Sequence, residues 1–404
     1  MKSKVLICAI AAIIFAVLAL AVRLSAQSQQ ESSQHATYVV HNLGTLGGTA
    51  SGANSINNIG WATGFSNRKG DKTQHAAVWI YGLKFDLGTL GGPNSGVEWP
   101  NKNDRGVIAG ISETAALDPL GENWSCAAFF PTITHHTCLG FRWEWGNMTA
   151  LPTLGGNNGY AAGINNRGEI AGWAENTVHD STCVSPQVLQ FEAVVWGPEK
   201  DQIKQLPTYH GDPDGAATAI NNKGQVVGIS GICGTAVGEF SAAHALLWEN
   251  GTVTNIGSLG GVAWNTPAAI NDRGVVVGFS DLPGDKNGAP NFHAFRWTKE
   301  HGIHDLGTLP GDVLSEALGI NERGQIVGES CQASFTNCRA FLWEDGKMTD
   351  LNKLVANDTG LHLVFANDIN DRGQIVGGAS DQKTGTSPAF IAIPKCDSDD
   401  DHNE

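Results

Sequence analysis

Three short motifs recur along the chain in a fixed order and divide most of it into seven similar units. The first is Ile-Asn-x-x-Gly or a close variant, with its glycines at positions 60, 106, 168, 224, 274, 324 and 373. The second is His-Ala-Phe-x-Trp or a relative, at 75–79, 140–143, 192–196, 244–248, 293–297, 339–343 and 388–391. The third is Leu-Gly-Thr-Leu-Gly-Gly, at 43–48, 87–92, 151–156, 206–211, 256–261 and 306–311, with a faint copy at 351–354. Such a period indicates one supersecondary unit per repeat, which buries its apolar side against its neighbours.

The unit around Asn271 shows what one repeat encodes. Residues 267–270 form a short apolar run, and 271–274 read Asn-Asp-Arg-Gly, a tight turn because Asn and Asp hydrogen-bond nearby backbone and Gly accepts positive φ. Residues 275–280 are heavily apolar, 292–297 alternate in character, and 303–306 follow a glycine turn. Four short antiparallel strands in about 50 residues are typical of a propeller blade, so seven units predict an all-β, seven-bladed β-propeller.

The two ends of the repeat region are complementary fragments. Residues 37–43 precede the first unit as an orphan fourth strand, and the last unit stops after its third strand, 389–393. Pairing these segments completes one blade and removes two exposed strand edges. We therefore predict a ring closed by an N-terminal strand in the C-terminal blade. Two stacked β-domains and an open β-array remain as alternatives.

The chain outside the repeats is short. Residues 1–26 combine a basic start, an apolar stretch and small residues before Gln27, the pattern of a secretory signal peptide, with an uncleaved N-terminal anchor as the alternative. The repeats occupy 37–394, and residues 395–404 form an acidic tail that we expect to be disordered. Both interpretations of the N-terminus predict an exported protein, either extracellular or periplasmic.

Charge limits the partners of this protein. The 25 basic residues are outnumbered by 40 acidic ones, which gives a net charge of −15. Such a surface repels phosphate backbones and anionic lipid, so we expect no nucleic-acid binding and no membrane contact beyond the N-terminal segment.

Taken together, the three motifs resemble those of the HAF family of bacterial extracellular repeat proteins. The resemblance covers residues 40–393, and the His-Ala pair itself is kept cleanly at His75, His244 and His293. It implies export and a repeat architecture. It implies no activity, so no catalytic residue is carried over.

The residues that recur in every unit are explained by packing and turn chemistry. The tryptophan of each third strand is expected to pack between blades, and the recurring histidine to hydrogen-bond a neighbouring backbone. The Asn-Asp-Arg-Gly turns lack the alternating acids of a calcium loop, and no serine lies in a Gly-x-Ser-x-Gly elbow. We therefore predict no catalytic constellation, no metal and no cofactor.

The segments that do not recur are better candidates for a binding site, because surface loops accept insertions and concentrate function. Long insertions separate the second and third strands of the second to fourth units. Since successive connections of an antiparallel blade alternate between its two ends, these loops lie on one face of the ring, opposite the Asn-x-x-Gly turns. The binding candidates on this insertion face are Trp99, Trp124, His135, His136, His179 and Trp264. Aromatic and histidine side chains there suit carbohydrate, protein or peptide surfaces. Packing of the aromatic residues in small cores beneath the loops is the alternative.

Seven cysteines follow the apolar N-terminal stretch. Cys331 and Cys338 flank a hairpin loop, Cys126 and Cys138 share one insertion, and Cys183 and Cys233 occupy equivalent loops of adjacent units. These three pairs are the disulfide candidates in an oxidising compartment, and Cys396 is left over.

Without a catalytic motif, the sequence favours an exported binding or scaffold protein that is not an enzyme, with an unknown ligand. The alternative is a propeller-type hydrolase or lyase acting on carbohydrate or peptide. An enzyme would gather acids or histidines at one mouth of the central channel.

Overall fold

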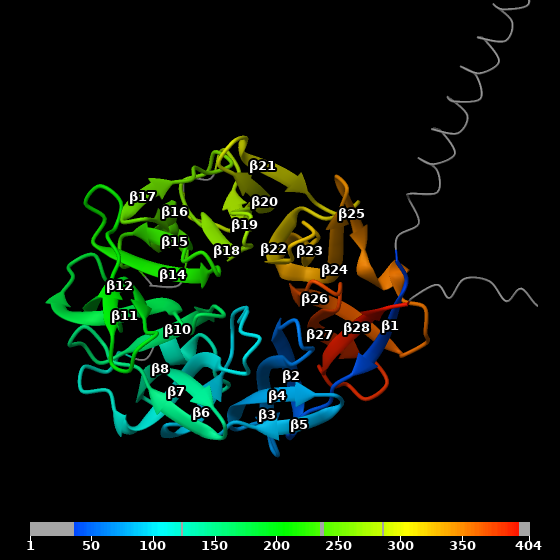
Figure 1. Cartoon of the computed structure of the whole chain (residues 1–404), viewed down its shortest axis with the longest axis horizontal. Helices are drawn as coiled ribbons and strands as arrows, with labels where there is room; N and C mark the ends of the chain where they lie inside the picture. Colours follow the sequence, from blue (N-terminus) through cyan, green and yellow to red (C-terminus); the bar gives the residue numbers. More distant parts are fainter. Residues whose placement is uncertain (1–35, 123, 235–237, 285–286, 396–404) are drawn as a thin grey trace, which may run out of the picture. The chain divides into compact units, whose positions relative to one another are not determined.

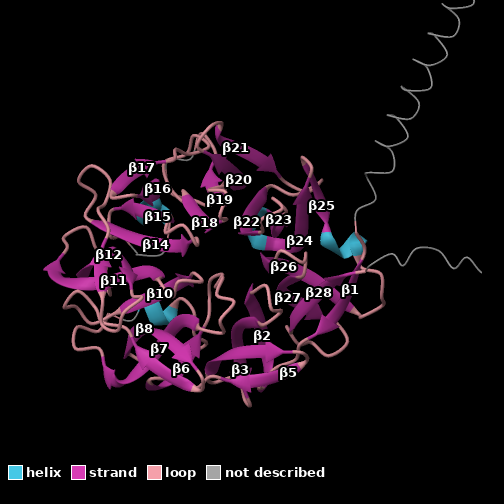
Figure 2. Cartoon of the chain, viewed as in Figure 1, coloured by secondary structure: helices cyan, strands magenta, loops and turns pink. Residues whose placement is uncertain are grey.

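A computed structural model describes residues 36–122, 124–234, 238–284 and 287–395. The expected signal peptide and nearly all of the acidic tail therefore lie outside the described residues. Residues Tyr38–Pro394 form one compact unit, a seven-bladed β-propeller of four-stranded antiparallel blades (Figures 1 and 2). Across the described segments, no helix has both the length and the apolarity needed to cross a membrane.

Six blades take their four strands from consecutive sequence. Blade 1 contains β2 (Gly47–Ile56), β3 (Ala62–Arg68), β4 (Gln74–Ile80) and β5 (Leu83–Asp86), and blade 2 contains β6 (Gly91–Gly96), β7 (Ile108–Leu117), β8 (His136–Glu144) and β9 (Asn147–Ala150). Blade 3 contains β10 (Gly159–Ile164), β11 (Ile170–His179), β12 (Leu189–Trp196) and β13 (Ile203–Gln205), and blade 4 contains β14 (Asp214–Ile220), β15 (Val226–Gly231), β16 (His244–Glu249) and β17 (Thr252–Asn255). Blade 5 contains β18 (Thr266–Ile270), β19 (Val276–Asp281), β20 (Phe292–Thr298) and β21 (Gly302–Gly307), and blade 6 contains β22 (Leu314–Ile320), β23 (Ile326–Gln332), β24 (Thr336–Glu344) and β25 (Lys347–Asp350).

Blade 7 closes the ring as predicted. It contains β26 (Leu361–Ile369), β27 (Ile375–Asp381), β28 (Ala389–Pro394) and, as its outermost strand, β1 (Tyr38–Asn42). β1 pairs antiparallel with β28, from Tyr38 opposite Pro394 to Asn42 opposite Phe390. Short helical turns lie between strands: α2 (Trp124–Ala127), η1 (Glu239–Ala242), η2 (Ala333–Phe335) and η3 (Leu351–Leu354).

The hydrophobic core lies between neighbouring blades. Trp248 of blade 4 packs with Ala171 and Ala193 of blade 3, and the equivalent Trp79 and Trp196 are only 2% and 1% exposed. The prediction that these third-strand tryptophans are core residues is therefore confirmed. A glycine in each second strand allows the close approach of the innermost strand. A Cβ on Gly278, for example, would lie 2.1 Å from the carbonyl oxygen of Thr266.

The recurring histidines differ from their expected contacts. Where the His-Ala pair is kept, the ring nitrogen contacts a carboxylate and not a backbone group, because an aspartate from an adjacent connection or strand reaches it. The pairs are His75–Asp86 at 2.7 Å, His244–Asp212 at 2.7 Å and His293–Asp305 at 3.0 Å.

A closed ring of side-chain hydrogen bonds links the Asn-x-x-Gly turns at one mouth of the channel. In each blade the Asn amide Nδ2 donates to the backbone carbonyl of the equivalent Asn in the next blade, at 2.8–3.1 Å. The members are Asn57, Asn103, Asn165, Asn221, Asn271, Asn321 and Asn370, and Asn370 donates back to Asn57. The residues that directly follow these asparagines form a second ring. The side-chain oxygen of each one accepts a hydrogen bond from the backbone N–H of the equivalent residue in the preceding blade. The carboxylates at this mouth are therefore engaged in joining blades.

The channel is crossed by residues 98–102 of blade 2, here called the cross-channel segment. β6 ends at Gly96, earlier than the innermost strands of the other blades, and the chain then leaves the sheet. The backbone N–H of Asn101 donates to Ser55 Oγ of blade 1 at 2.7 Å, and that of Lys102 donates to Ile164 O of blade 3 at 3.0 Å. The segment is therefore held on both sides by the blades next to blade 2.

Two side chains of the cross-channel segment extend further across the ring. Trp99 Nε1 donates to the carbonyl of Ala268 in blade 5 at 3.1 Å. Lys102 Nζ donates to the carbonyl of Ile369 in blade 7 at 2.8 Å and forms an ion pair with the buried Asp368. Four other blades are thus tied to a single stretch of blade 2.

Candidate functional site

On the insertion side of the cross-channel segment, the channel opens into an apolar pocket of about 240 Å³. Seven aromatic rings line it: Trp99, Phe129, Tyr160, Trp173, Phe191, Trp264 and Phe279. Small side chains such as Ala162 and Ala216 lie between the rings and leave the space open. We treat this hollow, here called the aromatic pocket, as the candidate site.

The innermost strands of blades 3, 4 and 5 form the wall of the aromatic pocket. Tyr160 and Ala162 of β10 both line it. β14 and β18 present Ala216 and Thr266 in the same way. Trp99 reaches the pocket from the cross-channel segment, because its blade has left the regular sheet at that point.

The rings of the pocket are held by their neighbours. Phe129 stacks on Tyr160 with ring centroids 5.5 Å apart, and Tyr160 contacts Trp173 at 6.5 Å. The indole N–H groups of Trp99 and Trp264 donate to backbone carbonyls of Ala268 and Gly288. With these N–H groups satisfied, the two indoles are held in place. The pocket is therefore preformed.

Two hydroxyl groups in the pocket wall have no hydrogen-bond partner within the described structure. Tyr160 Oη and Thr266 Oγ1 are buried, and each residue is 6% exposed. An unpaired buried polar group costs about 1–3 kcal/mol, so two such groups in one pocket are unusual in a packed core. Both oxygen atoms are almost fully covered by their surroundings.

The carboxyl group of Glu98 lies beside this wall. Burial raises its pKa to about 8, against the effect of hydrogen bonds from Gln74 Nε2 at 3.0 Å and Asn54 Nδ2 at 3.3 Å. Burial also raises the pKa of Tyr160 well above its ordinary value, and Glu98 raises it further. Burial therefore favours the uncharged form of both groups.

The insertion loops that surround the pocket are cross-linked. Disulfides join Cys126 to Cys138 within the insertion of blade 2 and Cys183 to Cys233 between blades 3 and 4. Both predicted pairs are present, as is the third, Cys331–Cys338 in blade 6. These links restrain the loops that frame the pocket.

A buried carboxylate joins two of the insertions as well. Glu122 Oε1, in the blade 2 insertion, accepts hydrogen bonds from the backbone N–H groups of Val188 and Leu189 in blade 3. The loops therefore form one connected rim.

The predicted binding residues fall into two groups. Trp99 and Trp264 line the aromatic pocket. His135 and His179 are exposed on the insertion face and His136 Nδ1 contacts the carbonyl oxygen of Thr114 at 2.7 Å, so none of the three histidines is a lining residue. Trp124 begins α2, and its side chain lies outside the described part of the structure.

The residues that complete the site were not identified from the sequence. Tyr160 and Thr266 occupy a repeat position at which blade 6 has Glu316. This position differs from blade to blade, with Gly52 in blade 1 and Ala216 in blade 4, and that variation within an otherwise repeated strand is the signal that would have identified them.

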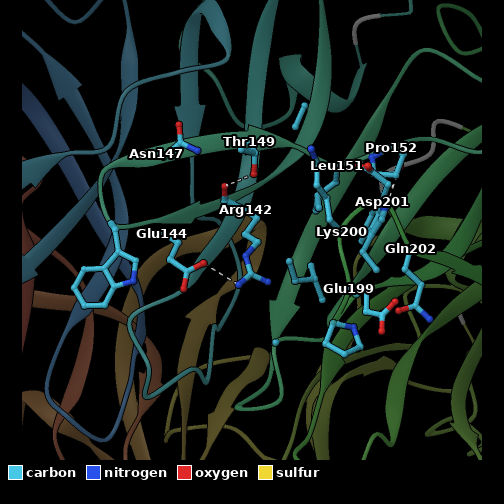
Figure 3. A pocket seen from close by; sticks show the side chains of 17 residues that line it. Arg142, Glu144, Asn147, Thr149, Leu151, Pro152, Glu199, Lys200, Asp201 and Gln202 are labelled. Carbon is cyan, nitrogen blue, oxygen red and sulfur yellow. Dashed lines mark hydrogen bonds and ion pairs between the residues drawn. The ribbon is translucent and has the colours of Figure 1, made fainter.

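A second hollow, of about 470 Å³, lies between the outer parts of blades 2 and 3. Figure 3 shows the Arg142–Glu144 ion pair, whose N–O distance is 2.9 Å, on one side of this hollow and the segment 199–202 on the other. Trp145 is 84% exposed at the turn between β8 and β9. Arg142 is already paired, and the charged side chains of 199–201 are exposed to solvent. This groove is therefore polar and open, unlike the aromatic pocket.

Comparison with known proteins finds distant structural similarities. No protein-family model matches the chain, and no curated protein matches its sequence. An acylaminoacyl peptidase from Pyrococcus horikoshii is similar at 9% identity with a TM-score of 0.49, and the match covers 89% of this chain and 51% of the peptidase. A Dyadobacter fermentans protein of unknown function is similar at 11% identity with a TM-score of 0.39, covering 89% and 98% of the two chains. An arabinanase from Bacillus subtilis is similar at 8% identity with a TM-score of 0.25, covering 56% and 89%.

Proposed function

We propose that this protein is an exported binding protein without catalytic activity, which holds a small ligand in the aromatic pocket on its insertion face. The observation that carries the proposal is the lining of the pocket. Aromatic rings fixed by their neighbours surround a preformed hollow, the usual character of a small-molecule site. Among the described lining residues, Tyr160 alone has a side chain that titrates.

Export is supported by the three disulfides. Such bonds persist outside the cytoplasm and are rare within it. The expected signal peptide over residues 1–26 points the same way, toward the periplasm or the exterior of a cell. The two disulfides of the insertion loops would then stabilise the rim of the pocket in the compartment where the ligand is met.

The alternative function is a hydrolase or lyase acting on carbohydrate or peptide. Such chemistry needs a positioned acid, base or nucleophile at the reacting bond. The described lining residues include no carboxylate, imidazole or thiol, so the pocket favours binding over catalysis.

The proposal is tested by filling the pocket. Ala216→Phe places a ring in the hollow, whereas Ala116→Phe adds the same ring at an exposed position on β7. Saturation-transfer NMR with a set of aromatic alcohols, methyl glycosides and short peptides measures binding to the mature protein and to both variants. We expect at least one class of compound to bind the parent protein and Ala116→Phe, and not Ala216→Phe.

Two results would contradict the proposal. Binding that survives Ala216→Phe in a folded variant would place the ligand elsewhere. Release of nitrophenol or nitroaniline from chromogenic glycosides or peptides, if it is abolished by Ala216→Phe, would establish the hydrolase instead.

A further inference from the structure

We propose that Asp180 and Asp214 share a single proton and form a pH-sensitive joint between the insertion of blade 3 and the innermost strand of blade 4, here called the carboxyl joint. The joint is closed while the proton is bound and loosens when the proton is lost in alkaline solution. This inference concerns the rim of the insertion face and does not depend on whether a ligand occupies the aromatic pocket.

The two carboxyl groups of the joint come from different blades. Asp180 directly follows β11, and its backbone N–H donates to the carbonyl of Val188 at 3.0 Å, across the insertion. Asp214 is the first residue of β14 and is fully buried. The carboxyl groups of Asp180 and Asp214 are in hydrogen-bonding contact with each other. They therefore link the insertion of blade 3 directly to blade 4.

The hydrogen bonds around the two carboxyl groups require one shared proton. Asp180 Oδ1 accepts from the backbone N–H of Thr182 at 2.6 Å. Asp214 Oδ1 accepts from the backbone N–H of Phe191 at 2.8 Å. The other oxygen of each carboxyl group, Oδ2, is buried and receives no hydrogen bond from the described residues. Two carboxylates in contact repel each other unless one of them is protonated, and a proton between them makes a strong O–H···O⁻ hydrogen bond.

The other charged groups near the joint do not neutralise it. Glu192 of β12 is the further charged group whose field acts on Asp214, and burial raises the pKa of Glu192 itself to about 7. The ring of His244, on β16, is engaged by Asp212 at 2.7 Å, and His179 is exposed to solvent. No basic side chain of the described residues is paired with either carboxyl group of the joint. The neutralising charge is therefore a proton.

The proton gives the joint a definite dependence on pH. Burial and the contact with Asp180 raise the pKa of Asp214 from 3.8 to about 9. Burial acts in the same direction on Asp180, but hydrogen bonds from Asp214 and Thr182 outweigh it and hold the pKa of Asp180 below its ordinary value. The folded protein thus keeps a proton that the unfolded chain releases. The contribution of this proton to stability is complete below about pH 4 and is lost as pH rises to about 9.

Loss of the proton should loosen one part of the insertion and not the whole of it. The disulfide Cys183–Cys233 keeps the tip of the insertion attached to blade 4 at every pH. The segments on either side of that tip, 176–181 and 187–191, are held by the carboxyl joint. Phe191 belongs to the second segment, and it both donates to Asp214 and lines the aromatic pocket. The joint therefore connects pH to the wall of the pocket.

The joint is tested with Asp214→Asn, in which an amide N–H replaces the shared proton and donates to Asp180 at every pH. The amide oxygen can still accept from Phe191. Asp345→Asn, at the exposed turn between β24 and β25, is the matched control. In urea unfolding between pH 5 and pH 8, the unfolding equilibrium constant of the parent protein should rise about tenfold per pH unit relative to that of Asp214→Asn, as expected for one proton. The parent protein and Asp345→Asn should change alike.

Two further measurements examine the joint itself. Hydrogen exchange of segments 176–181 and 187–191, followed by mass spectrometry, should be equal in the parent protein and Asp214→Asn near pH 6 and faster in the parent protein near pH 9.5. Carbon NMR of the aspartate side-chain carboxyls should show one group that is protonated at pH 7 in the parent protein and is missing from Asp214→Asn.

Three results would overturn the inference. The first is a stability difference between the parent protein and Asp214→Asn that is constant from pH 5 to pH 8. The second is a loss of stability on adding a chelator, seen in the parent protein and not in Asp214→Asn, which would place a metal ion between the carboxyl groups. The third is an NMR spectrum in which both carboxyl groups of the parent protein are ionised at pH 7. If Asp214→Asn does not fold, Asp180→Asn, whose amide can donate to Asp214, takes its place, and failure of both variants to fold would also refute the joint. None of these measurements involves a ligand, so their failure leaves the proposed function unaffected.

Discussion

The ring of asparagine side chains makes a quantitative prediction for Asn271→Ala. Asn271 is 4% exposed, and its amide makes three hydrogen bonds. Nδ2 donates to Asn321 O at 3.1 Å, and Oδ1 accepts from the backbone N–H groups of Arg273 at 3.1 Å and Val275 at 3.0 Å. At about 1 kcal/mol for each bond, the substitution should lower the free energy of unfolding by about 3 kcal/mol.

Urea unfolding, followed by fluorescence, measures this loss from the midpoint and slope of the transition. Asn271→Asp keeps the acceptor within the turn and removes the donor to blade 6, so its loss should lie between those of the parent and Asn271→Ala. Asn147→Ala, at an exposed position on β9, is the matched control and should change stability by less than about 0.5 kcal/mol. If Asn271→Ala costs no more than this control, the ring does not stabilise the fold.

Three further predictions concern the seam, the disulfides and pH. Deleting residues 37–44 removes β1 and the buried side chain of Tyr38 from blade 7, so the melting temperature should fall sharply; an unchanged value would contradict ring closure by this strand. Non-reducing peptide mapping should recover the peptide linked through Cys331–Cys338, and free thiols at both positions would refute the bond. Burial raises the pKa of Asp86, but hydrogen bonds from His75 and the backbone outweigh this effect and hold it below its ordinary value of 3.8. Its stabilising contribution is therefore present above about pH 4 and lost as pH falls through the folded-state pKa. Accordingly, the difference in the free energy of unfolding between the parent protein and Asp86→Asn should disappear in acid. A difference that grows at low pH would show that the ionised Asp86 does not stabilise the fold.

The fold could be predicted because each repeat encodes the same local chemistry seven times. The strands expected at 275–280 and 292–297 correspond to β19 (Val276–Asp281) and β20 (Phe292–Thr298). The complementary ends of the repeat region also predicted the pairing of β1 with β28. The predicted strand ends differ from the observed ones by a residue or two. The predicted order of strands in the sheet is unaffected, because the turns between the strands determine it.

The candidate site could be predicted only where the sequence departs from its own repeat. Trp99 and Trp264 are in segments outside the shared motifs, and both line the pocket. Tyr160 and Thr266 lie within regular strands, so their importance depends on which side of the strand faces the channel and on which neighbours leave their hydroxyls unpaired. The histidines of the insertion loops were predicted to bind a ligand but do not line the pocket, because a long loop can direct its side chains away from the channel.

The seam in blade 7 also has a consequence for the order in which the molecule can be completed. β1 is among the first parts of the propeller to be synthesised, yet its partner β28 is the last. Between those moments six blades can form from neighbouring sequence. During that time the backbone hydrogen-bonding groups of β1 have no partner strand. Contacts that span nearly the whole chain form slowly, since closing so long a loop costs entropy before it is repaid. The pairing of β1 with β28 is thus the last step in forming the ring. We expect a chain that ends before residue 389 to remain an open arc with an unpaired strand edge at each end.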